Sequence, residues 1–179
     1  LGYGVDEIAG QSVVYFGAHE IKSICKPSIS ALNERINKFE KDIALMTLAP
    51  ELKGSMELIN HLRDLNIVVS LGHSEADFDS ALKAFNNGVS MITHTFNAMK
   101  GLHHRATGPI GAALKKGDVF LGLIADGYHV HSDMIGFLKK IAPKQIVLVS
   151  DAISAYGFGD GLFKWDNRLI IVKKGLCTL

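Results

Sequence analysis

The stretch Ser90–Gly108, SMITHTFNAMKGLHHRATG, decides between the fold classes open to this chain. It begins within the short apolar run 89–92, which is typical of a buried strand. Polar side chains follow at once, namely His94, Asn97, Arg105 and two further histidines. Imidazoles, an amide and a guanidinium at the end of a strand are poor core material, but they suit a metal ion and an anionic ligand. We therefore interpret this stretch as a strand whose carboxyl end carries a functional site.

Other apolar runs along the chain end in the same way. The segments SLGHS (70–74), LIADGYH (123–129) and VLVSDA (147–152) each place a histidine or an aspartate directly after a predicted strand. Between these strands, apolar residues recur at intervals of three and four, as in amphipathic helices. One such helix is expected over residues 51–65, and the next is expected to start with a capping-box pattern of Ser74 and Asp77. A further short strand is expected at residues 12–16. Alternating strands and helices with short connections predict a parallel sheet covered by helices.

The position of the polar residues favours one α/β architecture over another. In a (β/α)8 barrel, functional groups lie at the carboxyl ends of several strands. Here His73, His94, the pair Asp126 and His129, and Asp151 follow four successive predicted strands. A doubly wound sheet would concentrate its site at one switch point, usually with a glycine-rich phosphate turn, and the sequence has no GxGxxG. We expect a (β/α)8 TIM-barrel type fold.

The predicted barrel is incomplete, because only about five or six β/α units are visible in 179 residues. We expect residues 1–163 to form a partial barrel and residues 164–179 to begin a small β-domain. The last segment, LIIVKKGLCTL, is predicted to contain a β-hairpin around residues 173–175. We expect the chain to be part of a longer protein.

Composition excludes several classes of partner. Nineteen Lys and Arg balance eighteen Asp and Glu, so no nucleic-acid-binding surface is predicted. No apolar run reaches transmembrane length, and no membrane association is expected. Cys25 and Cys177 are far apart and show no CxxC spacing, which favours free thiols in a reducing cytoplasm.

His73 and His94 are candidate metal ligands. They are separated by 21 residues, one β–α–β step, so neighbouring strands would bring both side chains to one cation. Two histidines plus a carboxylate, with one position open, is a catalytic arrangement for zinc, with iron as the alternative. Either histidine alone is more simply read as a satisfied strand-end residue, whereas two at matching strand ends favour the metal. The number of ions stays open.

Asp151 and the residues around the 100–104 segment are candidates for catalysis and anion binding. A carboxylate at Asp151 could bind metal, or take a proton from water and return it to a leaving group, although a helix N-cap is an equally good interpretation. Asn97, Arg105 and His129 suit phosphate recognition. A solvent-exposed loop arginine is the alternative for Arg105.

Seven short motifs together resemble a known family. They are GAHE (17–20), TLAPE (47–51), LGHSEA (71–76), THTFNAM (93–99), HHRATG (103–108), IADGYHV (124–130) and LVSDA (148–152). In this order they are similar to the N-acetylglucosamine-6-phosphate deacetylases, which are metal-dependent amidohydrolases with a (β/α)8 barrel and a small β-domain built from both chain ends. The resemblance extends from about Gly17 to Trp165.

The resemblance implies roles for individual residues. His73 and His94 would be metal ligands, and Asp151 would activate the hydrolytic water and protonate the amine. His19 would contact the substrate and help to polarise the acetamido carbonyl. The substrate would be an amino-sugar phosphate. Four residues would hold it: Asn97, Ala98, Arg105 and His129. Family dimers would complete this phosphate site across the subunit interface, so a homodimer is expected.

One departure from the family pattern affects the metal site. The family carries a His-x-Glu-Gly-Pro box before the GAH motif, and its glutamate is the third metal ligand, whereas the sequence here reads GVDEIAGQS (4–12). Glu7, 12 residues before His19, is the candidate for this ligand. Two alternatives therefore stay open: a non-catalytic sugar-phosphate-binding relative or inactive fragment, and another amidohydrolase such as a cyclic amidase. A lysine that bridges two metals would favour a cyclic amidase, and no lysine occurs at the end of a predicted barrel strand.

Overall fold

The computed structural model describes residues 25–36, 42–165 and 168–178, which form two sheets and five helices. The strands of the larger sheet are β1 (Leu45–Leu48), β2 (Val68–Leu71), β3 (Val89–Ile92), β4 (Phe120–Ile124) and β5 (Ile146–Val149). The helices are α1 (Ile29–Ile36), α2 (Ser55–Asp64), α3 (Phe78–Asn86), α4 (Gly108–Lys116) and α5 (Ser132–Ile141). The predicted strand 12–16 lies outside the described residues.

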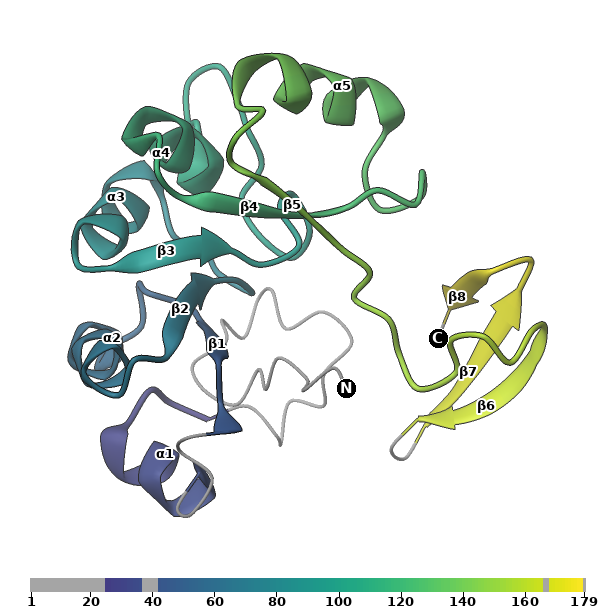
Figure 1. Cartoon of the computed structure of the whole chain (residues 1–179), viewed down its shortest axis with the longest axis horizontal. Coiled ribbons are helices and arrows are strands. Elements are labelled where there is room, and N and C mark those ends of the chain that lie inside the picture. Colours follow the sequence, from purple (N-terminus) through teal and green to yellow (C-terminus); the bar gives the residue numbers. More distant parts are fainter. Residues whose placement is uncertain (1–24, 37–41, 166–167, 179) are drawn as a thin grey trace.

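The larger sheet is parallel throughout, and its strands stand side by side in chain order, β1-β2-β3-β4-β5. Figure 1 shows the helices arranged in an arc along one side of this sheet. Among the described strands the order never reverses, so there is no switch point of the doubly wound kind. Helices along one side and sequential parallel strands are the geometry of a barrel wall. The predicted α/β fold of (β/α)8 type, incomplete in this chain, is confirmed with five strands.

The two faces of the sheet differ in polarity. Val69, Leu71, Leu121 and Leu123 are buried in the same core cluster as apolar residues of the helices. The intervening residues face the opposite, concave side, where the strand register aligns Thr47, Ser70, Met91 and Phe120 in one row. Because period-2 alternation separates the two faces, the hydroxyl groups of this row lie beneath the carboxyl ends of the strands.

Two predicted helix boundaries were wrong. The second helix was expected from Glu51, but α2 begins at Ser55 after Gly54, which has a φ of 94°. Such a left-handed residue cannot continue a helix, so residues 51–54 form a turn. The third helix was expected to be capped by Ser74, but its N-cap is Asp77, whose carboxylate accepts a hydrogen bond from the Ser80 N–H at 2.8 Å.

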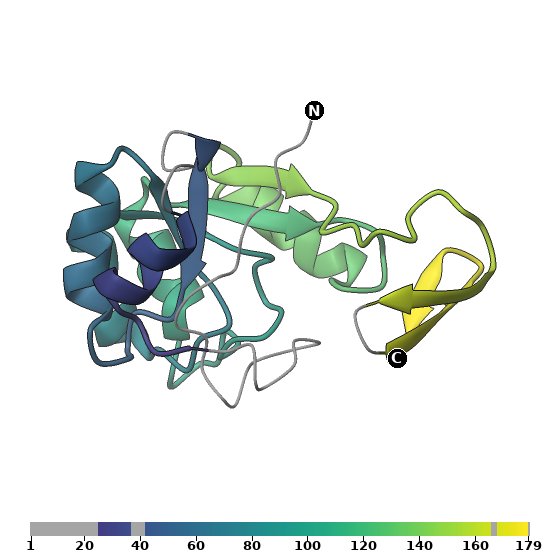
Figure 2. The same ribbon diagram turned by 90° about the horizontal axis from the view of Figure 1, so that it is seen from below.

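The smaller sheet is antiparallel and follows β5 after a glycine-containing connection. Its strands are β6 (Gly161–Trp165), β7 (Arg168–Lys173) and β8 (Leu176–Thr178). Figure 2 shows this sheet beyond the carboxyl ends of β4 and β5, at the opposite end of the molecule from α1 and α2. The predicted hairpin of β7 and β8 is confirmed, whereas β6 was not foreseen. A separate small β-domain beginning at residue 164 stays a prediction.

Helices of a length and hydropathy suited to crossing a bilayer are not found in the described part of the chain.

Gly72 lets three strands approach one another at the carboxyl edge of the sheet. A Cβ at this position would lie 2.7 Å from Thr47 Cγ2 and 2.9 Å from Thr93 Cβ, both closer than carbon atoms pack. We predict that Gly72→Ala lowers the free energy of unfolding by about 1–3 kcal/mol through overpacking. Urea denaturation of the variant and the parent protein would measure this difference in the free energy of unfolding.

Gly136 in α5 supplies the matched control, because a Cβ there meets no atom within 4 Å among the described residues. Gly136→Ala should leave stability unchanged or raise it by about 0.5–1 kcal/mol, since alanine restricts the unfolded chain. Equal stabilities for the two variants would contradict the close approach at Gly72.

Candidate functional site

His73 and His94 meet at the carboxyl edge of the parallel sheet. His73 lies two residues after β2 and His94 two residues after β3, and both side chains are buried, each 5% exposed. Their Nε2 atoms are 2.9 Å apart, and the rings stand edge to face at 77°. At this separation the two nitrogens share either a proton or a cation, because two bare lone pairs would repel each other. The predicted pairing of these histidines across one β–α–β step is therefore present.

The backbone at four of the predicted site residues is left-handed, with a φ of 48° at Ala98 in the segment after β3. The other three follow the ends of parallel strands: His73 has a φ of 46°, His94 of 29° and Asp151 of 49°. Residues other than glycine rarely adopt this conformation, which costs of order 1–3 kcal/mol and clusters at functional sites. The turn redirects each side chain from the sheet towards the space beyond the strand ends.

A hydroxyl cluster supports the two histidines from below. Thr93 Oγ1 lies 2.8 Å from Thr47 Oγ1 and 2.6 Å from Ser70 Oγ, so three neighbouring strands are joined by side-chain hydrogen bonds. Thr47 and Ser70 are fully buried. Because Thr93 directly precedes His94, this cluster fixes the strand end from which that imidazole projects.

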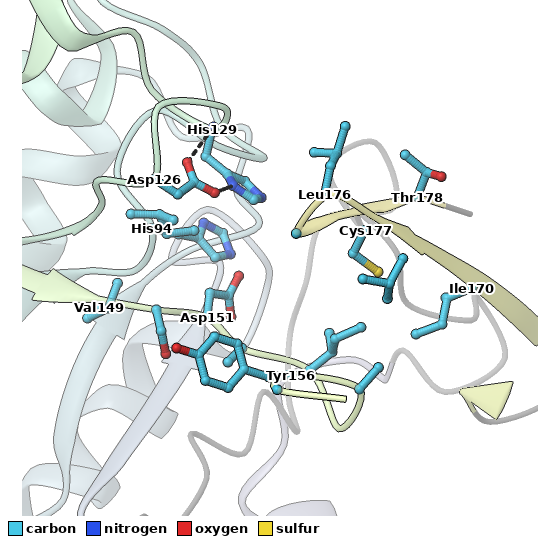
Figure 3. Close-up of a pocket in the computed structure, with 18 of the residues that line it drawn as sticks. His94, Asp126, His129, Val149, Asp151, Tyr156, Ile170, Leu176, Cys177 and Thr178 are labelled. Atoms are coloured by element: carbon cyan, nitrogen blue, oxygen red, sulfur yellow. Dashed lines mark hydrogen bonds and ion pairs between the residues drawn. The ribbon is translucent and has the colours of Figure 1, made fainter. Parts of the chain in front are cut away.

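A cavity of about 1270 Å³ opens over these residues, with the smaller sheet as its other wall. His73, His94, Asp126, His129 and Asp151 line it from the barrel side. Figure 3 shows the carboxylate of Asp151 beside the ring of His94, and the Asp126–His129 pair on the other side of that ring. The facing wall is mostly apolar and is formed by a set of residues from β7 and β8: Ile170, Val172, Leu176, Cys177 and Thr178. Charged and imidazole groups thus face an apolar wall, as in many small-molecule sites.

Asp126 holds His129 in a fixed orientation. Its Oδ2 lies 2.7 Å from His129 Nδ1, and its Oδ1 accepts hydrogen bonds from the backbone N–H groups of Tyr128 and His129, both at 2.9 Å. Burial by itself would raise the pKa of this carboxyl, but the hydrogen bonds from His129 and Tyr128 outweigh it and lower the pKa of Asp126 to about 2. With Nδ1–H held by the carboxylate, His129 presents Nε2 to the cavity.

Three predicted phosphate-binding residues lie away from this cavity. Asn97 and Ala98 follow β3, where the Asn97 side chain donates to the carbonyl of His94 and the Ala98 carbonyl accepts from the Ser74 N–H. Arg105 is exposed in the 100–106 loop, and its backbone N–H donates to His103 Nδ1. The structure therefore brings together His73, His94, His129 and Asp151, but not Asn97, Ala98 or Arg105.

Glu7 and His19, the predicted third metal ligand and substrate contact, lie outside the described residues. Within the described ranges no group of three or more His, Cys, Asp or Glu side chains is arranged to hold a metal ion. His61 lies 3.3 Å from Asn33 Oδ1 on the surface, and His131 is the N-cap of α5. Neither of these two histidines lines the cavity.

Sequence reasoning missed part of the cavity. Asp126 was noted only as a strand-end residue, although the Asp-x-x-His spacing is a recognisable signal for the pair it forms with His129. Tyr156 and the β8 residues Leu176 and Cys177 also line the cavity. No local sequence pattern predicts that Leu176 and Cys177 line the cavity, because their position depends on how the smaller sheet packs relative to the larger one.

The pKa of Asp126 provides a test of its pairing with His129. Because that pKa is below the ordinary 3.8, the stabilisation from this carboxylate is present above pH 3.8 and is lost as the pH falls towards 2. We predict that His129→Ala raises the pKa of Asp126, since the ring N–H is lost while two backbone donors remain. Carboxyl ¹³C NMR during acid titration would measure this shift.

His131→Ala is the matched control for that titration, because His131 contacts Asp133 on the surface instead. It should leave the Asp126 midpoint where it is in the parent protein. An unchanged midpoint in His129→Ala would show that the ring does not hold the carboxylate.

Comparisons with known proteins identify relatives over most of the chain. No family model matches. The chain is 37% identical over 147 residues to the N-acetylgalactosamine-6-phosphate deacetylase of Escherichia coli O157:H7, covering 82% of this chain and 39% of that protein. It is 33% identical over 160 residues to the N-acetylglucosamine-6-phosphate deacetylase of Vibrio furnissii, covering 89% and 40%. The chain thus spans about 40% of the length of these curated relatives.

Solved structures agree with the sequence relatives. The N-acetylglucosamine-6-phosphate deacetylase of Thermotoga maritima superposes with a TM-score of 0.86 at 38% identity, covering 96% of this chain and 47% of that one. A mutant of the Mycobacterium smegmatis enzyme, solved in complex with N-acetyl-D-glucosamine-6-phosphate, superposes with a TM-score of 0.89 at 28% identity, covering 94% and 45%. The relationship predicted from the motifs is confirmed: in sequence and in fold, this chain is related to the N-acetylglucosamine-6-phosphate deacetylases along most of its length.

Proposed function

We propose that this chain contributes to the active site of a metal-dependent amide hydrolase that converts N-acetylglucosamine-6-phosphate to glucosamine-6-phosphate and acetate. The observation that carries the proposal is the 2.9 Å approach of His73 Nε2 and His94 Nε2, buried at the ends of adjacent strands. The names of the relatives supply the reaction and the substrate. Because the chain spans less than half of those proteins, activity would require the barrel that they possess.

The two imidazoles fit a divalent metal, with zinc the first candidate and iron the second. Nitrogen ligands of one tetrahedral zinc ion lie about 3.3 Å apart, so the rings would need to separate only slightly. Glu7 is the candidate third ligand. A bound metal would polarise the acetamido carbonyl and lower the pKa of water.

Asp151 supplies the proton transfers in this proposal. Its carboxylate is exposed to the cavity and lies beside His94, within the space a substrate would occupy (Figure 3). It would take a proton from the attacking water as the new C–O bond forms. It would then deliver that proton to the amide nitrogen as the C–N bond breaks, so that the amine leaves neutral. The acetic acid formed would release the second water proton to solvent and become acetate. His19 would orient the carbonyl.

The sugar phosphate would be held by cationic and amide groups. His129 faces the cavity in an orientation fixed by Asp126. Arg105 is exposed, and Asn97 and Ala98 lie outside the cavity. In this proposal these residues would serve a second copy of the chain. We infer a homodimer in which Arg105 of one subunit completes the phosphate site of the other. The cytoplasmic location stays a prediction.

A second substrate deserves direct comparison, because the relative from Escherichia coli acts, by its name, on N-acetylgalactosamine-6-phosphate. The two sugars differ only in configuration at C4, and both carry the acetamido and phosphate groups that the site would use. Acetate release should therefore be measured with both substrates at equal concentration. Preference for the galactosamine substrate would revise the substrate and leave the reaction class unchanged.

The proposed reaction is tested by separating metal binding from chemistry. We predict that His73→Ala and His94→Ala each lose bound metal and acetate release, since each removes one ligand. Asp151→Asn should retain the metal but lose about 10²–10⁴-fold in kcat, the usual contribution of a general acid–base. Elemental analysis and acetate release measure the two effects.

His61→Ala is the control for these variants, since His61 lies on the surface of α2 away from the cavity. It should retain both metal and activity. If the parent protein stays folded but binds no metal, the result would favour the alternative of a non-catalytic protein that binds a sugar phosphate. Hydrolysis of a cyclic amide instead would favour the other amidohydrolase class.

A further inference from the structure

Glu51 joins the end of β1 to the turn that carries His73. Its Oε2 accepts a hydrogen bond from Ser74 Oγ at 2.7 Å, and its Oε1 accepts one from the Glu75 N–H at 2.6 Å. One carboxylate thus binds the two residues that immediately follow His73. Ser74 is fully buried, and its Oγ also accepts a hydrogen bond from the Ala76 N–H at 3.0 Å.

The same turn is held from its other side by the strand end that carries His94. The Ser74 N–H donates to the Ala98 carbonyl at 3.1 Å, and Ser74 forms a parallel bridge with Met99. Before the turn, the Gly72 N–H donates to the carbonyl of Leu48 at 3.2 Å. His73 therefore sits between fixed points on both neighbouring strand ends.

This attachment matters because the backbone at His73 is in an unfavourable region. With a φ of 46°, His73 would relax towards an ordinary conformation unless the surrounding hydrogen bonds prevented it. Any relaxation would rotate the imidazole away from His94, whose Nε2 lies 2.9 Å away. The two carboxylate oxygens of Glu51 accept the hydrogen bonds from the residues that follow His73. Among the described residues, Glu57, an exposed carboxylate of α2, makes no hydrogen bond with this turn.

We propose that Glu51 is a positioning residue for the metal site: by binding Ser74 and Glu75 it holds His73 in the left-handed conformation that presents Nε2 to the metal shared with His94. This inference rests on the proposed metal-dependent function. It assigns a role to the last residue of the TLAPE segment, which the proposed reaction leaves without one. Groups that orient a metal ligand typically contribute about 10- to 100-fold to metal affinity.

Zinc binding to the purified protein tests this role in three variants. Glu51→Ala removes both acceptors and should weaken zinc affinity about 10- to 100-fold. Glu51→Gln keeps one amide oxygen and should be intermediate. Glu57→Gln changes the net charge equally but should bind zinc like the parent. Competition with a chromophoric chelator would give the dissociation constants, and circular dichroism would verify that each variant is folded.

A second readout separates positioning from a general loss of stability. Cobalt substituted for zinc reports ligand geometry through its visible absorption bands. In folded Glu51→Ala these bands should shift relative to the parent, and Glu51→Gln should restore them in part. A variant that were merely less stable would keep the parent spectrum. If Glu51→Ala does not fold, the zinc affinity and the cobalt spectrum of Glu51→Gln test the positioning role instead.

The possible failures can be told apart. Parent protein that binds no zinc, or a His73→Ala variant that binds zinc as tightly as the parent, would overturn the proposed metal site and the role of Glu51 with it. A different result would overturn the positioning role alone. In that case His73→Ala would lose zinc binding, while both Glu51 variants would keep the zinc affinity and the cobalt spectrum of the parent.

Discussion

Parallel pairing of consecutive strands is the constraint on which the rest of this structure depends. Because β1 to β5 run in one direction and stand in chain order, all their carboxyl ends meet at the same edge of the sheet. Residues as distant in sequence as Glu51 and Asp151 are thereby placed around one region. The helices cover one face only, which leaves the concave face for the hydroxyl row that includes Thr47 and Ser70.

Hydrogen bonds connect the segments that carry the site histidines to the strands of the sheet. Hydrogen bonds run from Thr47 and Ser70 to Thr93, and others run from Glu51 to the turn after His73. Gly72 lies between two of these hydroxyl-bearing strands with no room for a side chain. The imidazoles are therefore oriented by the backbone geometry of the sheet as well as by their own contacts. A small change in strand spacing would be transmitted directly to the distance between His73 and His94.

Much of this arrangement could be predicted from the sequence. Apolar runs that end in a histidine or aspartate are a local signal, and their repetition predicted both the parallel sheet and the pairing of His73 with His94. Helix starts were harder, because the turn at Gly54 depends on a backbone conformation that composition does not specify. The second wall of the cavity was not predictable, since it arises from the packing of β7 and β8 beyond β5.

The left-handed backbone at His73, His94 and Asp151 has a consequence for how such a sequence can change over time. At each of these positions glycine would relieve the conformational penalty, so the residue that best suits the fold is not the residue to which the proposed chemistry assigns a role. Selection for thermal stability alone would favour drift towards glycine at these three sites. Under the proposed function, their retention would require selection on the proposed reaction. A lineage released from that selection would be expected to lose its imidazoles and its carboxylate here before it lost the surrounding sheet.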